Sequence, residues 1–104
     1  MGEIKNYKII WSPSFKRKLK NICNYILVQL KEPTIAKKFY KGIKSKLYSL
    51  SYFPERNLKI NIKDIEFRKL FYKNYVILYQ VHFENQEVLI LHIFHGNQDY
   101  LYHI

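Results

Sequence analysis

Two segments of the chain carry apolar residues at the three- and four-residue spacing of an amphipathic helix. The first begins near Ser12 or Ser14, either of which can cap it, and its apolar stripe consists of Phe15, Leu19, Ile22, Ile26 and Leu30. The second has Thr34 as its candidate N-cap, and its stripe consists of Ile35, Phe39, Ile43, Leu47 and Leu50. Because Pro33 disfavours a helical backbone at Glu32, we expect a tight break there and two antiparallel helices.

Four other segments are rich in β-branched and aromatic residues and predict strands: residues 7–11, 65–72, 75–83 and 87–95. Residues 58–64 fit a loop that includes at most a short strand. The predicted order is therefore β-α-α-β-β-β, an α+β fold in which a small, antiparallel-dominated sheet packs against a two-helix hairpin. A chain of 104 residues has the size of one domain, so residues 1–104 are expected to fold as a single domain.

The pairing of the last two predicted strands decides where the histidines lie. If Asn85 and Gln86 form a two-residue turn, Val76 stands across from His95. His95 then shares its face of the sheet with Leu78, Gln80 and His82. In the same register His92 lies on the opposite face. Both strands are apolar on both faces, which indicates that the helices cover one face and that a partner or a pocket occupies the other.

The net charge indicates an anionic partner. Fifteen lysines and three arginines against eight acidic residues give a charge of +10. Such an excess favours binding to nucleic acid or to an acidic protein, and the ten tyrosines add flat groups able to stack on bases. The alternative is a genome whose codon usage favours Lys, Ile, Asn and Tyr. The clustering of basic residues in the two helical segments favours a functional origin.

Several classes of protein are excluded by simple counts. Cys23 is the only cysteine, so neither an intramolecular disulfide nor a thiol-rich metal site can form. The four histidines lack metal-ligand spacing, and no cofactor is expected. No apolar run is long enough to cross a membrane and no targeting segment is recognisable at the N-terminus, so we expect a soluble, cytoplasmic protein.

Four motifs, in this order along the chain, resemble the RelE/ParE superfamily of toxins from type II toxin–antitoxin systems. They are "YI" followed by P-x-x-A-x-x-F within residues 25–39, "LSYFP" at 50–54, R-K-L-x-x-x-x-Y-x-x-L-Y-x-V at 68–81, and the terminal "HIFHGNQDY" at 92–100. The resemblance covers nearly the whole chain. It implies a small sheet backed by two helices, and a cognate antitoxin whose acidic, partly disordered segment wraps the basic toxin.

The resemblance implies two alternative activities, which the fold alone does not separate. RelE-like toxins enter the ribosomal A site and cleave the bound messenger RNA, whereas ParE-like toxins inhibit DNA gyrase without covalent chemistry. Two departures weaken the nuclease interpretation, because Val76 stands where RelE-like enzymes usually have arginine, and Asn97 where they often have a basic residue. A third hypothesis is an inactive toxin that only binds its antitoxin.

RNA cleavage without a metal requires proton transfer at the 2′- and 5′-oxygens and donors for the phosphorane charge. The resemblance implies a nuclease site on the sheet face away from the helices, at the ends of the three C-terminal strands and the tail. Our hypothesis assigns catalysis to Arg68, His95 and Tyr100, and RNA or phosphate binding to Lys69, Lys73, Gln98 and Tyr102. The alternative for Arg68 is an ion pair with Glu66 or Asp64, and His82 and His92 are expected to be structural. The sequence thus favours ribosome-dependent cleavage, with gyrase inhibition as the alternative.

Overall fold

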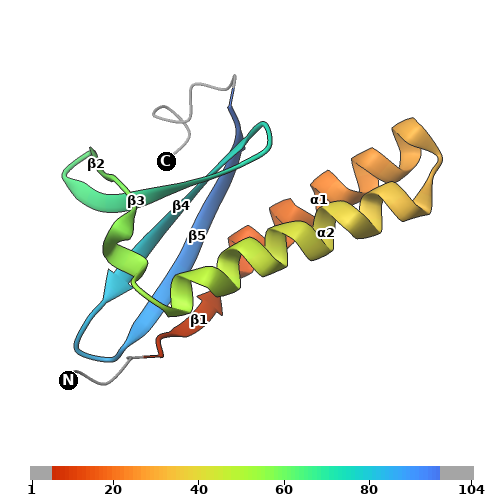
Figure 1. Cartoon of the computed structure of the whole chain (residues 1–104). Helices are drawn as coiled ribbons and strands as arrows, with labels where there is room; N and C mark the ends of the chain where they lie inside the picture. Colours follow the sequence, from red (N-terminus) through yellow and green to blue (C-terminus); the bar gives the residue numbers. More distant parts are fainter. Residues whose placement is uncertain (1–5, 97–104) are drawn as a thin grey trace.

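The fold consists of a five-stranded mixed sheet and a hairpin of two long helices (Figure 1). The computed structural model describes residues 6–96. The elements, in chain order, are β1 (Lys8–Trp11), α1 (Pro13–Leu30), α2 (Pro33–Tyr48), the 3₁₀ turns η1 (Ser49–Ser51) and η2 (Pro54–Arg56), β2 (Lys59–Ile62), β3 (Ile65–Tyr72), β4 (Tyr75–His82) and β5 (Glu87–His95). The α+β class is confirmed, and β2 is the short strand for which the sequence left room.

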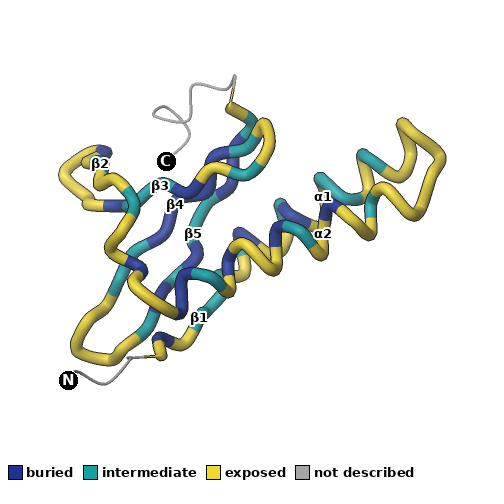
Figure 2. The backbone as a smooth tube through the Cα atoms, viewed as in Figure 1, coloured by how far each residue is buried: buried dark blue, intermediate teal, exposed yellow. Residues whose placement is uncertain are grey.

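The strands lie in the order β1-β5-β4-β3-β2, with β1 parallel to β5 and every other pair antiparallel. One end of the helical hairpin packs against the sheet, and the other extends well beyond it (Figure 1). This arrangement explains why only Phe15 and Leu19 of the α1 stripe are buried, while Leu30 near the far end is exposed. Figure 2 shows that the end of the hairpin away from the sheet is largely exposed.

The two helices begin differently, α1 with a side-chain cap and α2 with a proline at its first position. The Ser12 hydroxyl accepts a hydrogen bond from the Phe15 amide at 3.1 Å, which confirms Ser12 as the α1 cap. At α2 the predicted cap Thr34 is wrong, because Glu32 holds the N-cap position and Pro33 begins the helix. Proline is favourable at the first helical position, where its missing N–H would have had no partner within the helix.

Apolar side chains form a buried cluster on each face of the sheet. The larger cluster joins both helices to the sheet and includes Phe15, Phe39, Ile43, Leu47, Leu70, Ile77, Tyr79 and Ile90. The smaller cluster, here called the second apolar cluster, consists of Ile62, Phe67, Val76, Leu78 and Phe94. The sheet is therefore apolar on both sides, as the strand sequences predict.

The predicted register of β4 and β5 is wrong in two respects. The connection has four residues, 83–86, so that His82 rather than Glu84 pairs with Glu87. Farther along, a bulge between Leu78 and Tyr79 shifts the pairing by one residue. Because a one-residue shift exchanges the two faces of a strand, both histidines change sides: His92 pairs with Leu78, and His95 with Tyr75.

Gly42 of α2 provides a test of helix–sheet packing. A methyl group at this position would overlap the hydroxyl of Tyr72, whose ring also packs edge-on against Phe39 with centroids 5.5 Å apart. We predict that Gly42→Ala lowers the free energy of unfolding by about 1–2 kcal/mol, although alanine is the better helix former. In a Tyr72→Ala background the same substitution should stabilise the protein. Urea unfolding of the four variants measures this, and stabilisation in both backgrounds would contradict the packing argument.

Candidate functional site

Arg68 lies on the helix-facing side of β3, where it is opposite Tyr79 of β4. Its Nη1 donates hydrogen bonds to the backbone carbonyls of Glu55 at 2.6 Å and Asn57 at 2.7 Å. The alternative role for Arg68 was an ion pair with Glu66 or Asp64, and these backbone hydrogen bonds take its place. Glu66 pairs instead with Lys59 at 3.8 Å. Arg68 therefore holds the connection between η2 and β2 against the sheet.

A buried tyrosine reinforces the same connection. The Tyr79 hydroxyl donates to the Pro54 carbonyl at 2.6 Å and accepts from the Asn57 side-chain amide at 3.0 Å. Burial raises the pKa of Tyr79, which keeps the hydroxyl protonated and able to donate. At the exposed end of the loop, Arg56 donates to the Ser49 hydroxyl at 2.7 Å. We call the hydrogen bonds of Arg68, Tyr79 and Asn57 the loop clamp.

Lys73 and His95 come together at one end of the sheet. They line a hollow of about 310 Å³ with Phe71, Asn74, Tyr75, Val76 and Gly96. The His95 ring stands edge-on to Tyr75 with centroids 5.4 Å apart. Lys73 occupies the turn between β3 and β4 in a left-handed backbone conformation, with φ of 51°. This hollow, here called the end hollow, combines a cation, an imidazole and two aromatic rings.

Arg68 is remote from that hollow. The register places Tyr72 next to Tyr75 and Tyr75 next to His95, so Arg68 lies four residues along β3 from the His95 row. This separation is about 13 Å along the strand, and two strand spacings add about 10 Å across the sheet. One phosphate cannot contact both side chains in this arrangement.

Lys69 and His92 lie on the other face, in one row across the sheet with Leu78 between them. Aromatic rings surround His92, which stacks on Phe94 at 5.8 Å and stands edge-on to Phe67 at 5.8 Å. Lys18 reaches from α1 to within 4.1 Å of the Phe94 ring centroid. Burial, with a smaller contribution from the Lys18 charge, lowers the pKa of His92, so the ring is neutral at pH 7.

The other three predicted site residues, Gln98, Tyr100 and Tyr102, lie outside the described residues. Within residues 6–96, the predicted site is divided among three places. Arg68 lies at the loop clamp, Lys73 and His95 line the end hollow, and Lys69 lies on the sheet face that carries the second apolar cluster. The same part of the chain contains no group of three or more His, Cys, Asp or Glu side chains able to hold a metal ion.

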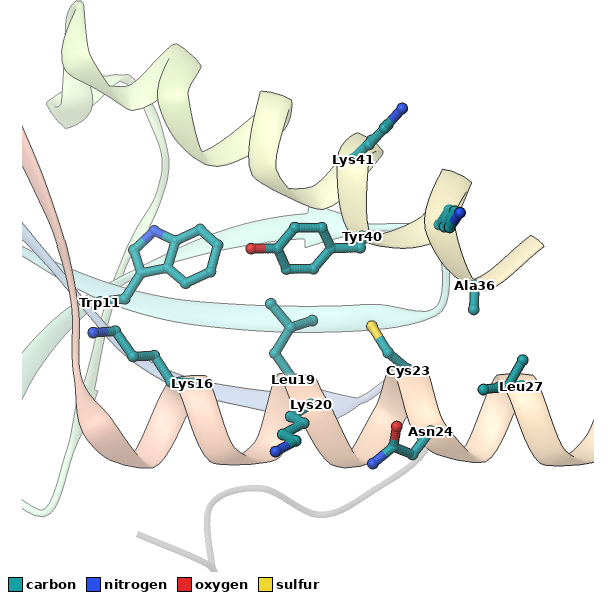
Figure 3. Close-up of a pocket in the computed structure, with 11 residues that line it drawn as sticks. Trp11, Lys16, Leu19, Lys20, Cys23, Asn24, Leu27, Ala36, Tyr40 and Lys41 are labelled. Atoms are coloured by element: carbon teal, nitrogen blue, oxygen red, sulfur yellow. The ribbon is translucent and has the colours of Figure 1, made fainter. Parts of the chain in front are cut away.

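A groove between the two helices was not predicted from the sequence. A groove of about 540 Å³ runs between α1 and α2, and it is lined by Trp11, Lys16, Leu19, Lys20, Cys23, Asn24, Leu27, Ala36, Lys37, Tyr40 and Lys41. Figure 3 shows the rings of Trp11 and Tyr40 over the space between the helices, with Leu19 and Cys23 directed into it. Four lysines and no acidic residue line the groove, so it suits an apolar segment with acidic flanks. The sequence signal was the four-residue spacing of Leu19, Cys23 and Leu27.

The mixed sheet and the two-helix hairpin have the arrangement expected for the RelE/ParE superfamily of toxins. The family model for the ParE toxin of the type II toxin–antitoxin system, parDE, matches residues 9–100. The chain belongs to this family of ParE toxins. A comparison with curated protein sequences finds no match.

Among solved structures, the fold is similar to a chain in the crystal structure of the toxin–antitoxin complex RelBE2 from Mycobacterium tuberculosis. The TM-score is 0.64 at 18% sequence identity, and the match covers 91% of this chain and 97% of that one. Within the described residues, neither helix is both long and apolar enough to cross a membrane.

The loop clamp predicts that Arg68 is important for stability. We expect Arg68→Ala to lower the free energy of unfolding by about 2 kcal/mol, because two backbone carbonyls lose a charged donor. Lys59→Ala on the neighbouring strand serves as the control and should change stability by less than about 0.5 kcal/mol. Urea unfolding measures both variants. An Arg68→Ala protein as stable as the control would show that the clamp contributes little.

The environment of His92 predicts a pH dependence of stability. Its pKa in the folded protein lies below the ordinary value of 6.5, so the unfolded chain takes up the proton first as the pH falls. The contribution of neutral His92 is therefore complete above pH 6.5 and is lost as the pH falls below that value. Between pH 7.5 and 5.5, His92→Gln should lose less stability than the wild type in urea unfolding. An equal loss of stability in His92→Gln and in the wild type would contradict this account of His92.

Proposed function

We propose that this ParE-family toxin arrests growth by binding a protein target, DNA gyrase, without cutting RNA. The observation that carries this proposal is the second apolar cluster. It occupies the sheet face on which the resemblance implied a nuclease site, and Val76, in the place of the usual arginine, is one of its buried members. Donors for a phosphorane would have to compete there with buried hydrophobic side chains.

The dispersal of the candidate catalytic groups supports the same proposal. Phosphoryl transfer requires its acid, base and cationic donors around one phosphorus atom. The clamp already engages the Arg68 guanidinium, and the end hollow with His95 is too distant to share a phosphate with it. A toxin that acts by contact needs no such convergence.

We propose that the groove between α1 and α2 receives the cognate antitoxin. The helices contain nine basic residues and no acidic residue, four in α1 and five in α2. Lys16 and Arg17 lie near the α1 N-terminus, where the helix dipole disfavours positive charge. These charges therefore reduce helix stability, and an acidic partner would offset their repulsion. An amphipathic antitoxin segment would place apolar side chains against Trp11 and Tyr40 and carboxylates near the rim lysines.

One observation favours a second function, ribosome-dependent cleavage of messenger RNA. The end hollow combines Lys73 and His95 with two aromatic rings, Phe71 and Tyr75. A lysine can hold phosphate, an imidazole can transfer protons near pH 7, and the rings can stack on bases. In this alternative His95 is the residue on which activity depends.

The two functions are separated by brief expression of the toxin in bacteria. We expect relaxed or broken plasmid DNA with intact messengers, because the target is gyrase. Mapping of messenger 5′ ends and plasmid supercoiling from the same cells measures both effects, and His95→Ala should leave growth arrest unchanged. New cuts at fixed codon positions within translated regions, abolished by His95→Ala, would overturn the gyrase proposal and support cleavage.

Charge reversal at the groove tests the antitoxin site. Lys37→Glu with Lys41→Glu should weaken binding of the antitoxin encoded beside the toxin by about tenfold or more, because two rim charges become repulsive. The matched control is Lys38→Glu with Lys46→Glu, which makes the same charge change on exposed positions of α2 that do not line the groove. Titration calorimetry compares both pairs with the wild type. Equal losses in both pairs would mean that overall charge, and not the groove, determines binding.

A further inference from the structure

Phe53 combines a strained backbone with an exposed aromatic side chain. Its φ and ψ of 54° and 57° lie in the left-handed helical region, which residues other than glycine, asparagine and aspartate rarely adopt. Pro54 follows directly, and proline disfavours helical backbone in the residue before it. The Phe53 side chain is nevertheless 66% exposed. Phe53 therefore bears the strain of the turn while burying little of its apolar side chain.

The residues that follow Phe53 hold this conformation in place. Pro54, Glu55 and Asn57 each offer a backbone carbonyl to the loop clamp, and the Arg56 amide donates to the Phe53 carbonyl at 3.2 Å. The clamp ends on Tyr79 in the middle of the sheet, so the loop is attached to a rigid part of the protein. A strained residue persists only where its surroundings determine its conformation in this way.

The turn itself does not require phenylalanine. Glycine or asparagine would adopt the left-handed conformation at little cost. Burial does not explain the aromatic ring either, since most of it contacts solvent. A rigidly presented, exposed aromatic ring is instead the kind of side chain that anchors protein–protein interfaces.

The charge around Phe53 identifies the kind of partner. Residues 49–58 contain one acidic and one basic residue, Glu55 and Arg56, and the Arg68 guanidinium bound to the carbonyls of this loop adds one positive charge. Two neighbours in the loop, Tyr52 and Leu58, are also exposed, Leu58 to 77%. A loop with exposed apolar side chains and few charges, on a chain of charge +10, suits neither nucleic acid nor an acidic antitoxin. It suits an apolar pocket on a protein.

We propose that Phe53 is the anchor by which this toxin holds its protein target, and that the antitoxin binds elsewhere, on the basic groove. This inference rests on the proposed function, in which the toxin acts by contact with a protein. Phe53, with Tyr52 next to it in the chain, enters an apolar pocket of the target, while the clamp reduces the entropic cost of ordering the loop on binding.

Phe53→Asn tests the proposal, because asparagine tolerates the left-handed backbone but removes the aromatic ring. The variant should unfold at a urea concentration no lower than the wild type and bind the antitoxin with unchanged affinity. Its inhibition of purified gyrase should require about tenfold more protein or higher, and expression should no longer arrest growth. The control is Phe83→Asn, which removes an equally large ring that is 55% exposed on the connection between β4 and β5 and should leave inhibition unchanged.

The outcomes separate this inference from the proposed function. Full growth arrest by folded Phe53→Asn overturns the inference, whatever the target is. If the wild type arrests growth without inhibiting gyrase, the gyrase proposal fails, and the growth arrest of Phe53→Asn still decides the role of Phe53. Loss of antitoxin binding together with loss of arrest would also overturn the inference, because the two surfaces would then not be separate.

Discussion

The hydroxyl of Tyr79 is the polar group on which the arrangement of this fold depends. It is fully buried in β4, near the middle of the sheet, where an unpaired hydroxyl would cost about 1–3 kcal/mol. Its partners are the Pro54 carbonyl and the Asn57 amide, both in the connection between the helical hairpin and β2. Together with Arg68, this pairing fixes where the hairpin leaves the sheet and where β2 begins.

The bulge beside Tyr79 has an equally wide effect. It gives β5 one extra residue, Leu91, and so decides which side chains of β5 face the helices. His92 is directed into a group of aromatic rings, and His95 towards Tyr75. Arg68 lies four residues along β3 and two strands away from His95, and His92 lies on the opposite face of the sheet from Arg68, so these three side chains suited to phosphate chemistry do not meet. This separation is the physical reason for preferring a toxin that binds over one that cleaves.

Charge is distributed unevenly over the chain. The nine basic residues of the helical hairpin repel one another, and four of them line a groove whose other lining residues are mostly apolar. Such a surface gains stability when an acidic partner binds, because a ligand that binds only the folded state stabilises it. The loop at residues 49–58 carries few charges and exposes aromatic side chains. One surface is strongly basic and the other carries exposed apolar side chains. One small protein can therefore recognise an antitoxin mainly through charge and a target mainly through apolar contact.

The class of the fold could be predicted from local patterns. Helical periodicity, the break at Pro33 and the runs of β-branched residues are properties of short segments, and they correctly predicted the helices, the sheet and its apolar faces. The four motifs likewise pointed to the RelE/ParE superfamily. The position of each candidate site residue in the fold could not be predicted from local patterns, because it depends on long-range strand pairing and on where the helices and strands end.

The register of β4 and β5 illustrates this limit. No local signal distinguishes a two-residue turn from the four-residue connection at 83–86, and none reveals the bulge at Leu91, whose one-residue shift exchanges the faces of His92 and His95. Arg68 appeared as a phosphate donor because its carbonyl partners lie 11 and 13 residues earlier in the chain. The sequence by itself determined the elements, the charge and the family. Tertiary structure decided which polar side chains meet, because their partners are chosen by packing between segments distant in the chain.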